Sequence, residues 1–167
     1  MAESNRDRIN PSLLDRLTDD GPGAPGRGAS TTVSELRKSV LRDLTWLFNT
    51  TRTFGPDETE AQPQVRNSVL NYGLPPLSGS TASGLDIRQV ERALRQAILD
   101  FEPRILPDSV SVKAVLESEE HDHHNVISLQ IEGLLWAQPV PIELLLRTQF
   151  DLESGQSRVE ETAPGRH

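Results

Sequence analysis

The sequence predicts an α+β domain in which a small three-stranded antiparallel sheet is covered on one face by two main helices, with a tethered N-terminal helix. Two segments, at about 32–49 and 85–101, place apolar residues at helical spacing. Three later segments, 110–117, 127–132 and 142–152, alternate apolar with polar residues. This period of two indicates strands that bury one face, and the short connections between them favour an antiparallel meander.

The first main helix begins with a capping box, in which Thr32 and Glu35 satisfy each other's free backbone groups. Its apolar stripe, which should pack on the sheet, consists of Val33, Leu36, Val40, Leu44 and Leu47, widened by Leu41 and Phe48. Trp46 lies off this stripe. We expect it to cover a side cluster rather than an interface, because tryptophan is largely buried in most folds.

The second main helix ends at a proline. Its N-cap is either Ser83 or Asp86, and we expect its last residue near Glu102, because Pro103 cannot continue a helix and forces the residue before it out of the α region. The stripe that it buries consists of Ile87, Val90, Leu94, Ile98 and Phe101. This helix therefore leads directly into the first strand segment.

Composition divides the chain into an arm, a domain and a tail. Residues 1–31 are expected to form a flexible arm that holds a short amphipathic helix at 12–18, followed by a linker at 19–30 that is rich in glycine and proline. Residues 32–153 should form the domain. Residues 154–167 contain almost no apolar side chains, so we expect them to be disordered.

Smaller features are expected inside the domain. A polar loop is predicted at 50–64, and a short helix at 65–72, which Gly73 would terminate. Gly133 interrupts the alternation of the second strand segment and predicts a β-bulge.

The outer edge of the last strand segment has two interpretations. It is either a site at which another chain adds a strand, or an edge that Arg147 and Asp151 protect. The sequence leaves both open.

Composition also excludes several function classes. The net charge is −8 and no basic stripe is present, so nucleic-acid binding is not expected. The chain has no cysteine, which excludes disulfides and thiolate metal sites. The N-terminus lacks the apolar segment of a signal peptide, and no apolar run approaches the ~20 residues that span a bilayer. We therefore expect a cytoplasmic protein without membrane insertion.

One cluster resembles a metal site. Residues 119–124 include His121, His123 and His124, which with the neighbouring carboxylates suit zinc or nickel. The cluster is contiguous and lies in a predicted turn, whereas metal sites usually collect ligands from separate, rigid elements. A solvated hairpin loop is the preferred interpretation, and no metal or other cofactor is expected. A metal-dependent module remains a third and weaker hypothesis for function.

A pair of carboxylates is available for glycoside hydrolysis. Glu91, Asp100 and Glu102 share one helical region, and hydrolysis requires two carboxyl groups about 5–10 Å apart. A charged chain always offers such pairs, and this chain has few aromatic residues for a sugar-binding cleft. The pair is therefore a weak indication of an enzyme.

Glu102, Pro103 and Arg104 form a stiff corner after the second main helix. Residues two apart in an extended chain point to the same side, so Glu102 and Arg104 should project together. One interpretation is a rigid charged surface that a partner grips. The alternative is that Arg104 caps the last helical carbonyls while Glu102 is solvated.

Four motifs over about residues 10–152 carry a resemblance to a known family. The first is Ser12–Leu17, and the second combines Ser34–Leu36 with Val40–Thr50. The third is Val69–Pro75, and the fourth is Phe101–Ile105. On these motifs the chain resembles the small baseplate proteins of contractile injection machines. That family takes in the TssE subunit of bacterial type VI secretion systems and the lysozyme-like baseplate wedge protein of contractile-tailed phages. Residues 32–153 would then be the lysozyme-like baseplate domain.

The resemblance implies a structural, non-enzymatic role at the baseplate. Such a subunit binds wedge proteins of the TssF, TssG and TssK type and initiates polymerisation of the contractile sheath, without a small-molecule substrate. The expected partner-binding residues are Glu102, Pro103 and Arg104 of the corner and Leu13, Leu14 and Leu17 of the N-terminal helix. The competing hypothesis is a peptidoglycan hydrolase.

Overall fold

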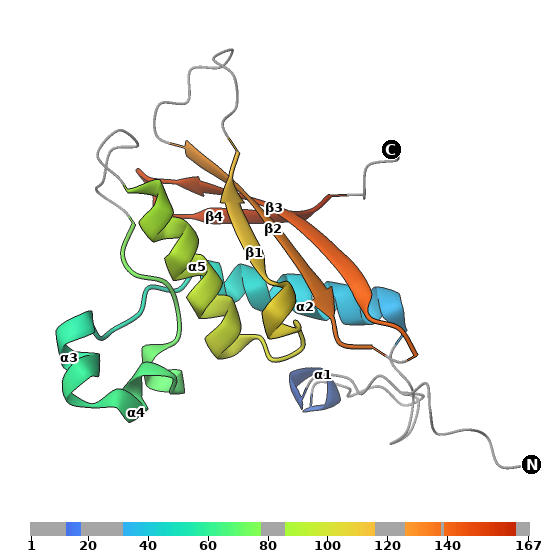
Figure 1. The fold of residues 1–167 in the computed structure, drawn as a ribbon, viewed down its shortest axis with the longest axis horizontal. Helices are drawn as coiled ribbons and strands as arrows, with labels where there is room; N and C mark the ends of the chain where they lie inside the picture. The colour runs from blue at the N-terminus through green and yellow to red at the C-terminus, as the bar shows by residue number, and fades with distance from the viewer. Residues whose placement is uncertain (1–12, 18–31, 78–85, 116–125, 138, 163–167) are drawn as a thin grey trace, which may run out of the picture.

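The computed structural model describes residues 13–17, 32–77, 86–115, 126–137 and 139–162. Its centre is one antiparallel sheet with strand order β1-β2-β3-β4 (Figure 1). The strands are β1 (Ser111–Ala114), β2 (Val126–Leu135), β3 (Ile142–Asp151) and β4 (Ser157–Glu161). The predicted α+β class and antiparallel meander are confirmed, but the sheet has four strands and the prediction of three is wrong.

Two long helices cover the sheet. Helix α2 (Val33–Phe48) contacts β4, and helix α5 (Ile87–Phe101) contacts β1 (Figure 1). A side chain caps the start of each helix. Thr32 forms the predicted capping box with Glu35 at the start of α2. At the start of α5, the Asp86 carboxylate accepts a hydrogen bond from Arg88 N–H. The core between helices and sheet includes Leu36, Val40, Leu44, Val90, Leu94, Ile98, Leu129, Ile131, Leu146 and Phe150.

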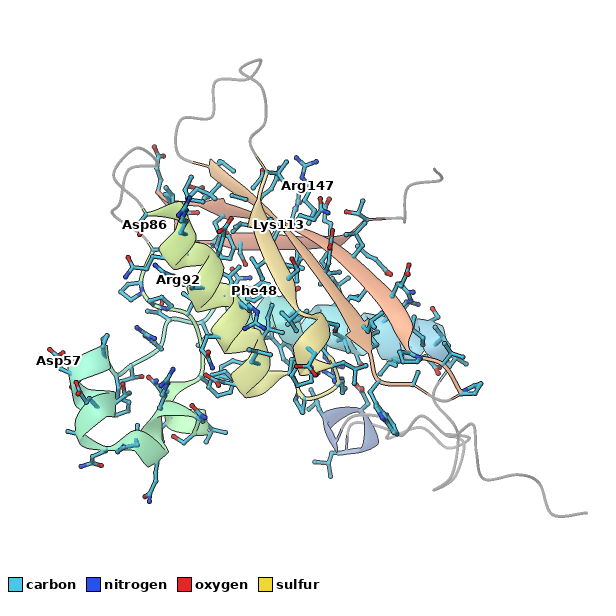
Figure 2. All side chains as sticks on the ribbon, viewed as in Figure 1. Phe48, Asp57, Asp86, Arg92, Lys113 and Arg147 are labelled. Atoms are coloured by element: carbon cyan, nitrogen blue, oxygen red, sulfur yellow. The ribbon has the colours of Figure 1, made fainter. Side chains whose placement is uncertain are left out.

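The pairing of β2 with β3 shows why one face of the sheet is apolar. Ile131 lies opposite Leu146, and both are buried. The neighbouring pair, Gln130 opposite Arg147, belongs to the other face. Lys113 of β1 lies opposite Gln130, and Figure 2 labels Lys113 and Arg147 on these strands. The alternation in the sequence therefore corresponds to a buried face and a polar face.

The fourth strand lies in the segment that the sequence analysis assigned to a disordered tail. A tight turn returns the chain from β3: the Asp151 carboxylate accepts hydrogen bonds from Glu153 N–H and Ser154 N–H, and Gly155 has a φ of 71°. Val159 is the buried residue of β4, opposite Thr148. One inward apolar residue is too weak a pattern to indicate a strand, so the sequence did not reveal it.

Gly133 does not form the predicted bulge. The pairing of β2 with β3 continues without interruption through Gly133, opposite Leu144. A Cβ atom at Gly133 would lie 2.9 Å from Ile105 Cγ2. The glycine therefore lets Ile105 pack closely on the strand.

The segment between α2 and α5 holds more structure than predicted. Residues expected to be a polar loop include α3 (Pro56–Ala61), and the expected short helix is divided into α4 (Pro63–Arg66) and the 3-10 turn η1 (Val69–Asn71). Gly55 precedes α3, and its N–H donates to the Glu58 carboxylate, which stabilises the first turn. A second 3-10 turn, η2 (Pro107–Ser109), precedes β1.

The N-terminal helix α1 (Leu13–Leu17) falls within the predicted range of 12–18. The linker at 19–30, the histidine cluster at 119–124 and residues 163–167 lie outside the described residues. In the part of the chain that the structure describes, no helix is long and apolar enough to cross a membrane.

Candidate partner-binding site

Five charged side chains form a continuous series of ion pairs, which we term the ionic row: Asp15, Arg42, Asp43, Arg104 and Glu102. Arg42 bonds Asp15 at 2.5 Å and Asp43 at 2.9 Å. Arg104 bonds the other oxygen of Asp43 at 2.5 Å and both oxygens of Glu102, at 2.7 and 2.5 Å. The row thus connects α1, α2 and the corner after α5.

The backbone fixes the corner end of the row. Helix α5 ends at Phe101, and Glu102 is its C-cap, with its N–H bonded to Ile98 O. Beyond Pro103 the chain runs against the end of β2: Trp136 N–H donates to Arg104 O at 2.7 Å, and Leu106 N–H donates to Leu134 O at 2.8 Å. These bonds fix the corner, but the chain forms a turn there, with Ile105 N–H bonded to Glu102 O at 3.2 Å, so the expectation of an extended chain after Glu102 is wrong.

Glu102 and Arg104 do lie together, but they point inward. The Glu102 side chain is only 3% exposed, and the Arg104 side chain is 23% exposed. The remaining Arg104 donors reach Asp43 and, at 3.1 Å, the Ser39 hydroxyl of α2. The alternative in which Arg104 caps helical carbonyls and Glu102 is solvated is wrong, because these side chains bond each other and α2.

The electrostatics of the row follow from burial and pairing. Burial lowers the pKa of Arg104, but its bonds to Glu102 and Asp43 and their negative charges outweigh this effect, so the pKa is raised overall. The pKa of Arg42 is also raised, first by its hydrogen bond to Asp15 and then by that to Asp43. Both guanidinium groups therefore stay charged, which matters most for the buried carboxylate of Glu102.

Tyr72, which belongs to the motif at Val69–Pro75, contacts the ionic row. Its hydroxyl donates to the backbone oxygen of Asp43 at 3.3 Å, and its ring meets Phe101 edge-on at 5.2 Å between centroids. Burial raises the pKa of Tyr72, and the negative charges of Asp43 and Glu102 raise it further. The motifs that predicted the family resemblance thus converge on one region of the fold.

Both tryptophans of the chain lie beside this row and are half exposed. Trp46 is 50% exposed, so the expectation that it covers a side cluster is wrong; the Arg42 guanidinium lies 5.1 Å from its ring centroid. Trp136, whose N–H bonds Arg104 O, is 52% exposed. Tryptophan and arginine are the residues most enriched at the energetic centres of protein interfaces.

The N-terminal helix adds apolar surface next to Asp15. Leu14 and Leu17 are exposed; nothing is described for the Leu13 side chain. We term the set Leu14, Leu17, Arg42, Trp46 and Trp136 the docking face. Pro103 is also exposed, whereas its neighbours Glu102 and Arg104 are not.

Sequence reasoning missed Ser39, Arg42, Asp43 and Trp136. A usable signal existed for the α2 residues. Ser39 and Asp43 are four residues apart and therefore lie on one face of the helix. They border the apolar stripe at Val40 and Leu44, where a polar pair needs a buried partner. The sequence did not indicate that this partner is Arg104.

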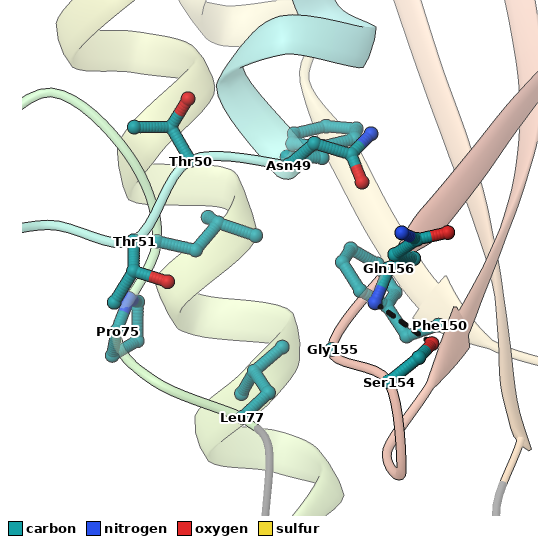
Figure 3. Close-up of a pocket in the computed structure, with 11 residues that line it drawn as sticks. Asn49, Thr50, Thr51, Pro75, Leu77, Phe150, Ser154, Gly155 and Gln156 are labelled. Carbon is teal, nitrogen blue, oxygen red and sulfur yellow. Dashed lines mark hydrogen bonds between the residues drawn. The ribbon is translucent and has the colours of Figure 1, made fainter.

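The carboxylates considered for hydrolysis accept hydrogen bonds from within the protein. The Glu91 carboxylate accepts a hydrogen bond from Ala114 N–H at 2.7 Å, and Asp100 accepts one from Gln96 at 2.8 Å. A pocket of about 470 Å³ opens elsewhere, between the end of α2 and the turn from β3 to β4 (Figure 3). It has no ionisable side chain among its described lining residues, which include Phe48, Thr50, Leu77, Phe150 and Gln156.

Side chains of α5 and of Asn49, the C-cap of α2, cover parts of both sheet edges. The Asn49 amide bonds both backbone groups of Ser157 on β4, donating to its oxygen at 3.0 Å and accepting from its N–H at 2.8 Å. On the other edge, Glu91 accepts from Ala114 N–H and Arg95 donates to Val110 O. Both interpretations of the outer edge of β3, a strand-addition site and an edge that Arg147 and Asp151 protect, assumed that β3 is the last strand of the sheet. That assumption is wrong, because β4 pairs with β3 over residues 146–150.

Comparison with known proteins identifies one family. Residues 34–140 match the family described as baseplate wedge protein gp25, which is more than half of the chain. This range contains the ionic row except Asp15, together with both tryptophans and Tyr72. Comparisons with curated proteins and with solved structures gave no match.

Proposed function

Because this chain belongs to the baseplate wedge protein gp25 family, which includes TssE, we propose that it is a structural subunit of a type VI secretion baseplate. In this role it binds wedge proteins of the TssF, TssG and TssK type in the cytoplasm. It then provides the surface on which the contractile sheath begins to polymerise.

The observation that carries the proposal is the placement of two half-exposed tryptophans beside the ionic row. Exposed tryptophan loses little conformational entropy on binding and buries a large area, which favours a protein partner. The Arg42 guanidinium lies over the Trp46 ring and is held by Asp15 and Asp43, so this part of the docking face is ordered before a partner arrives.

Glu102 and Arg104 support the docking face in this account. Glu102 is too deeply buried to reach a partner unless the corner opens, so it acts through Arg104, which in turn holds Asp43 beside Arg42. Pro103, which is exposed, is the member of the corner that can touch a partner directly.

Co-purification with the wedge proteins tests the proposal. Replacing Arg42 and Trp46 by Ala should abolish capture while the domain stays folded, because both side chains are partly exposed. Arg158→Ala is a matched control: this arginine is exposed on β4 and bonds Glu160, which does not belong to the ionic row, so its loss should leave capture unchanged. Equal capture of the wild-type chain, the Arg42→Ala/Trp46→Ala variant and the control would contradict the proposal.

We propose that a sheath subunit adds a strand to an edge of the four-stranded sheet, at β1 or β4, and not to β3. Support comes from the order of the strands, since β4 occupies the edge of β3. Sheath subunits would then pair with β4 or β1 after the covering side chains move. Baseplates that carry Val159→Pro should bind wedge proteins but fail to nucleate sheath, because proline cannot donate a backbone hydrogen bond.

We also propose that the protein is not an enzyme. The three carboxylates considered for hydrolysis each accept a hydrogen bond within the protein, from Ala114, Gln96 and Arg104. Purified protein at high concentration should therefore leave peptidoglycan intact. Degradation of peptidoglycan that Glu102→Gln abolishes would contradict this proposal and favour the hydrolase.

A further inference from the structure

An excursion of the chain at residues 52–73 contributes little to the core. It contains α3, α4 and η1 and extends from one corner of the molecule (Figure 1). Neither α3 nor α4 buries a residue. Core packing therefore does not explain why this excursion has a defined shape.

The stem of the excursion is nevertheless held rigidly. Arg52 N–H donates to Leu74 O and Leu74 N–H donates to Thr50 O, both at 2.8 Å. Gly73 makes this approach possible: its φ is 120°, and a Cβ atom there would lie 2.3 Å from Thr50 O. Both ends of the excursion are thus fixed to each other.

A buried polar side chain closes the excursion from inside. Asn71 is buried, and its side-chain oxygen accepts from Phe54 N–H at 3.0 Å while its NH₂ group donates to Arg66 O at 3.4 Å. Burying an amide is favourable only when it is bonded in this way. Asn71 is the last residue of η1, so it sets the position of the two residues before it.

Those two residues are apolar and exposed. Val69 is 84% exposed and Leu70 is 65% exposed. Adjacent aliphatic side chains on a rigid turn lose little backbone entropy when a partner covers them. We term Val69 and Leu70 the apolar projection. It is formed before a partner binds, because the stem of the excursion is fixed and the bonded Asn71 holds η1 in place.

The surroundings of the projection favour a protein partner with a basic rim. Asp57, Glu58 and Glu60 on α3 are all exposed, and α3 has no basic residue. Arg66 on α4, the helix that contacts η1, is exposed as well, so three acidic side chains stand against one basic side chain across α3 and α4. Figure 2 shows Asp57 on the outer side of this excursion. These carboxylates repel the anionic surface of a membrane and attract lysine or arginine on a protein.

The projection is continuous with the ionic row. Tyr72 directly follows η1, and it contacts Phe101 and the backbone of Asp43. We propose that Val69 and Leu70 insert into an apolar socket with a basic rim on a wedge protein. This inference rests on the proposed function and adds a second contact to the docking face.

The test compares binding of purified wedge proteins to the wild-type chain, to Val69→Ser/Leu70→Ser, and to the control Val33→Ser, which changes an exposed valine at the start of α2. We expect the double variant to melt like wild type and to bind about tenfold or more weakly, and the control to bind like wild type. Asp57→Lys/Glu60→Lys should also weaken binding, more strongly at low salt.

The outcomes separate the two proposals. Binding of Val69→Ser/Leu70→Ser within about twofold of wild type overturns this inference and leaves the proposed function standing. Absence of wild-type binding overturns the proposed function, and this inference with it. Self-association of the wild-type chain that the double variant loses, or wild-type binding to anionic vesicles, would identify a second copy or a membrane as the occupant and overturn the inference.

Discussion

The two ends of the ionic row use the same chemistry at different depths in the protein. At the corner, the Glu102 side chain is 3% exposed and bonds Arg104 through both oxygens. At the N-terminal helix, the Asp15 side chain is 30% exposed and bonds Arg42. A pair with a fully buried carboxylate is costly to break, whereas a pair that solvent reaches on both sides contributes less to stability and exchanges partners more readily. The row therefore combines a structural end with an end suited to binding.

The largest expected effect is the loss of Arg104. Arg104→Ala leaves the buried Glu102 carboxylate without its counter-ion, and we expect a loss of about 3–5 kcal/mol in the free energy of unfolding. Denaturant unfolding measures it. Glu102→Met/Arg104→Met removes both charges and is the control, which should unfold within about 2 kcal/mol of wild type. An Arg104→Ala protein as stable as wild type would mean that the corner is solvated.

Loss of Glu102 alone should cost less than loss of Arg104. Arg104 is partly exposed and keeps Asp43 and Ser39 as partners, so Glu102→Ala removes charge-assisted bonds without leaving a charge isolated. We expect a loss of about 2 kcal/mol, again from denaturant unfolding. If Glu102→Ala were the more harmful of the two, the assignment of Glu102 as the costly buried charge would be incorrect.

At the exposed end, Asp15→Asn should change global stability by less than about 1 kcal/mol. Hydrogen exchange should instead reveal faster opening of α1 (residues 13–17), because the Asp15–Arg42 bond ties this helix to α2. Adding salt to the wild-type protein should have a similar effect. Unchanged exchange in α1 would show that other contacts hold it.

The smallest expected effect concerns pH. Burial, followed by the charges of Asp43 and Glu102, raises the pKa of Tyr72 in the folded protein. The protonated phenol is thus favoured by folding, and its contribution is complete below the unfolded pKa of about 10 and lost as the pH rises through the folded pKa. Above pH 10, wild type should lose stability relative to Tyr72→Phe; parallel curves for the two proteins would contradict this.

The sequence predicted those parts of the fold that have a strong local pattern. The capping box of Thr32 and Glu35 is present, and so are the apolar stripes of α2 and α5. Val33 is the exception: it was expected in the buried stripe of α2 but is 46% exposed, because it lies in the first turn of the helix. Helix α3 was missed because the segment Pro56–Ala61 buries nothing and therefore has no stripe. Strand β4 was missed because its register depends on β3 and on a turn at Asp151, rather than on its own composition.

The candidate site was predictable only in part, for a related reason. Pro103 correctly predicted where α5 ends, and Glu102 and Arg104 do lie together, but in a turn and not in the extended chain from which this was argued. The direction in which they point depends on Asp43 and Ser39, which are 61 and 65 residues from Arg104. Spacing within one segment cannot indicate such a distant partner. The sequence therefore suggested that Glu102 and Arg104 project outward, although they point inward in the fold.

The most direct test of this account measures the affinity of purified wedge proteins for two folded variants, Arg42→Ala/Trp46→Ala and Glu102→Met/Arg104→Met. If the docking face makes the contact and the corner supports it, the first variant loses binding and the second retains most of it. If the second variant stays folded and loses binding while the first binds like wild type, then Glu102 and Arg104 contact the partner themselves and the account is wrong.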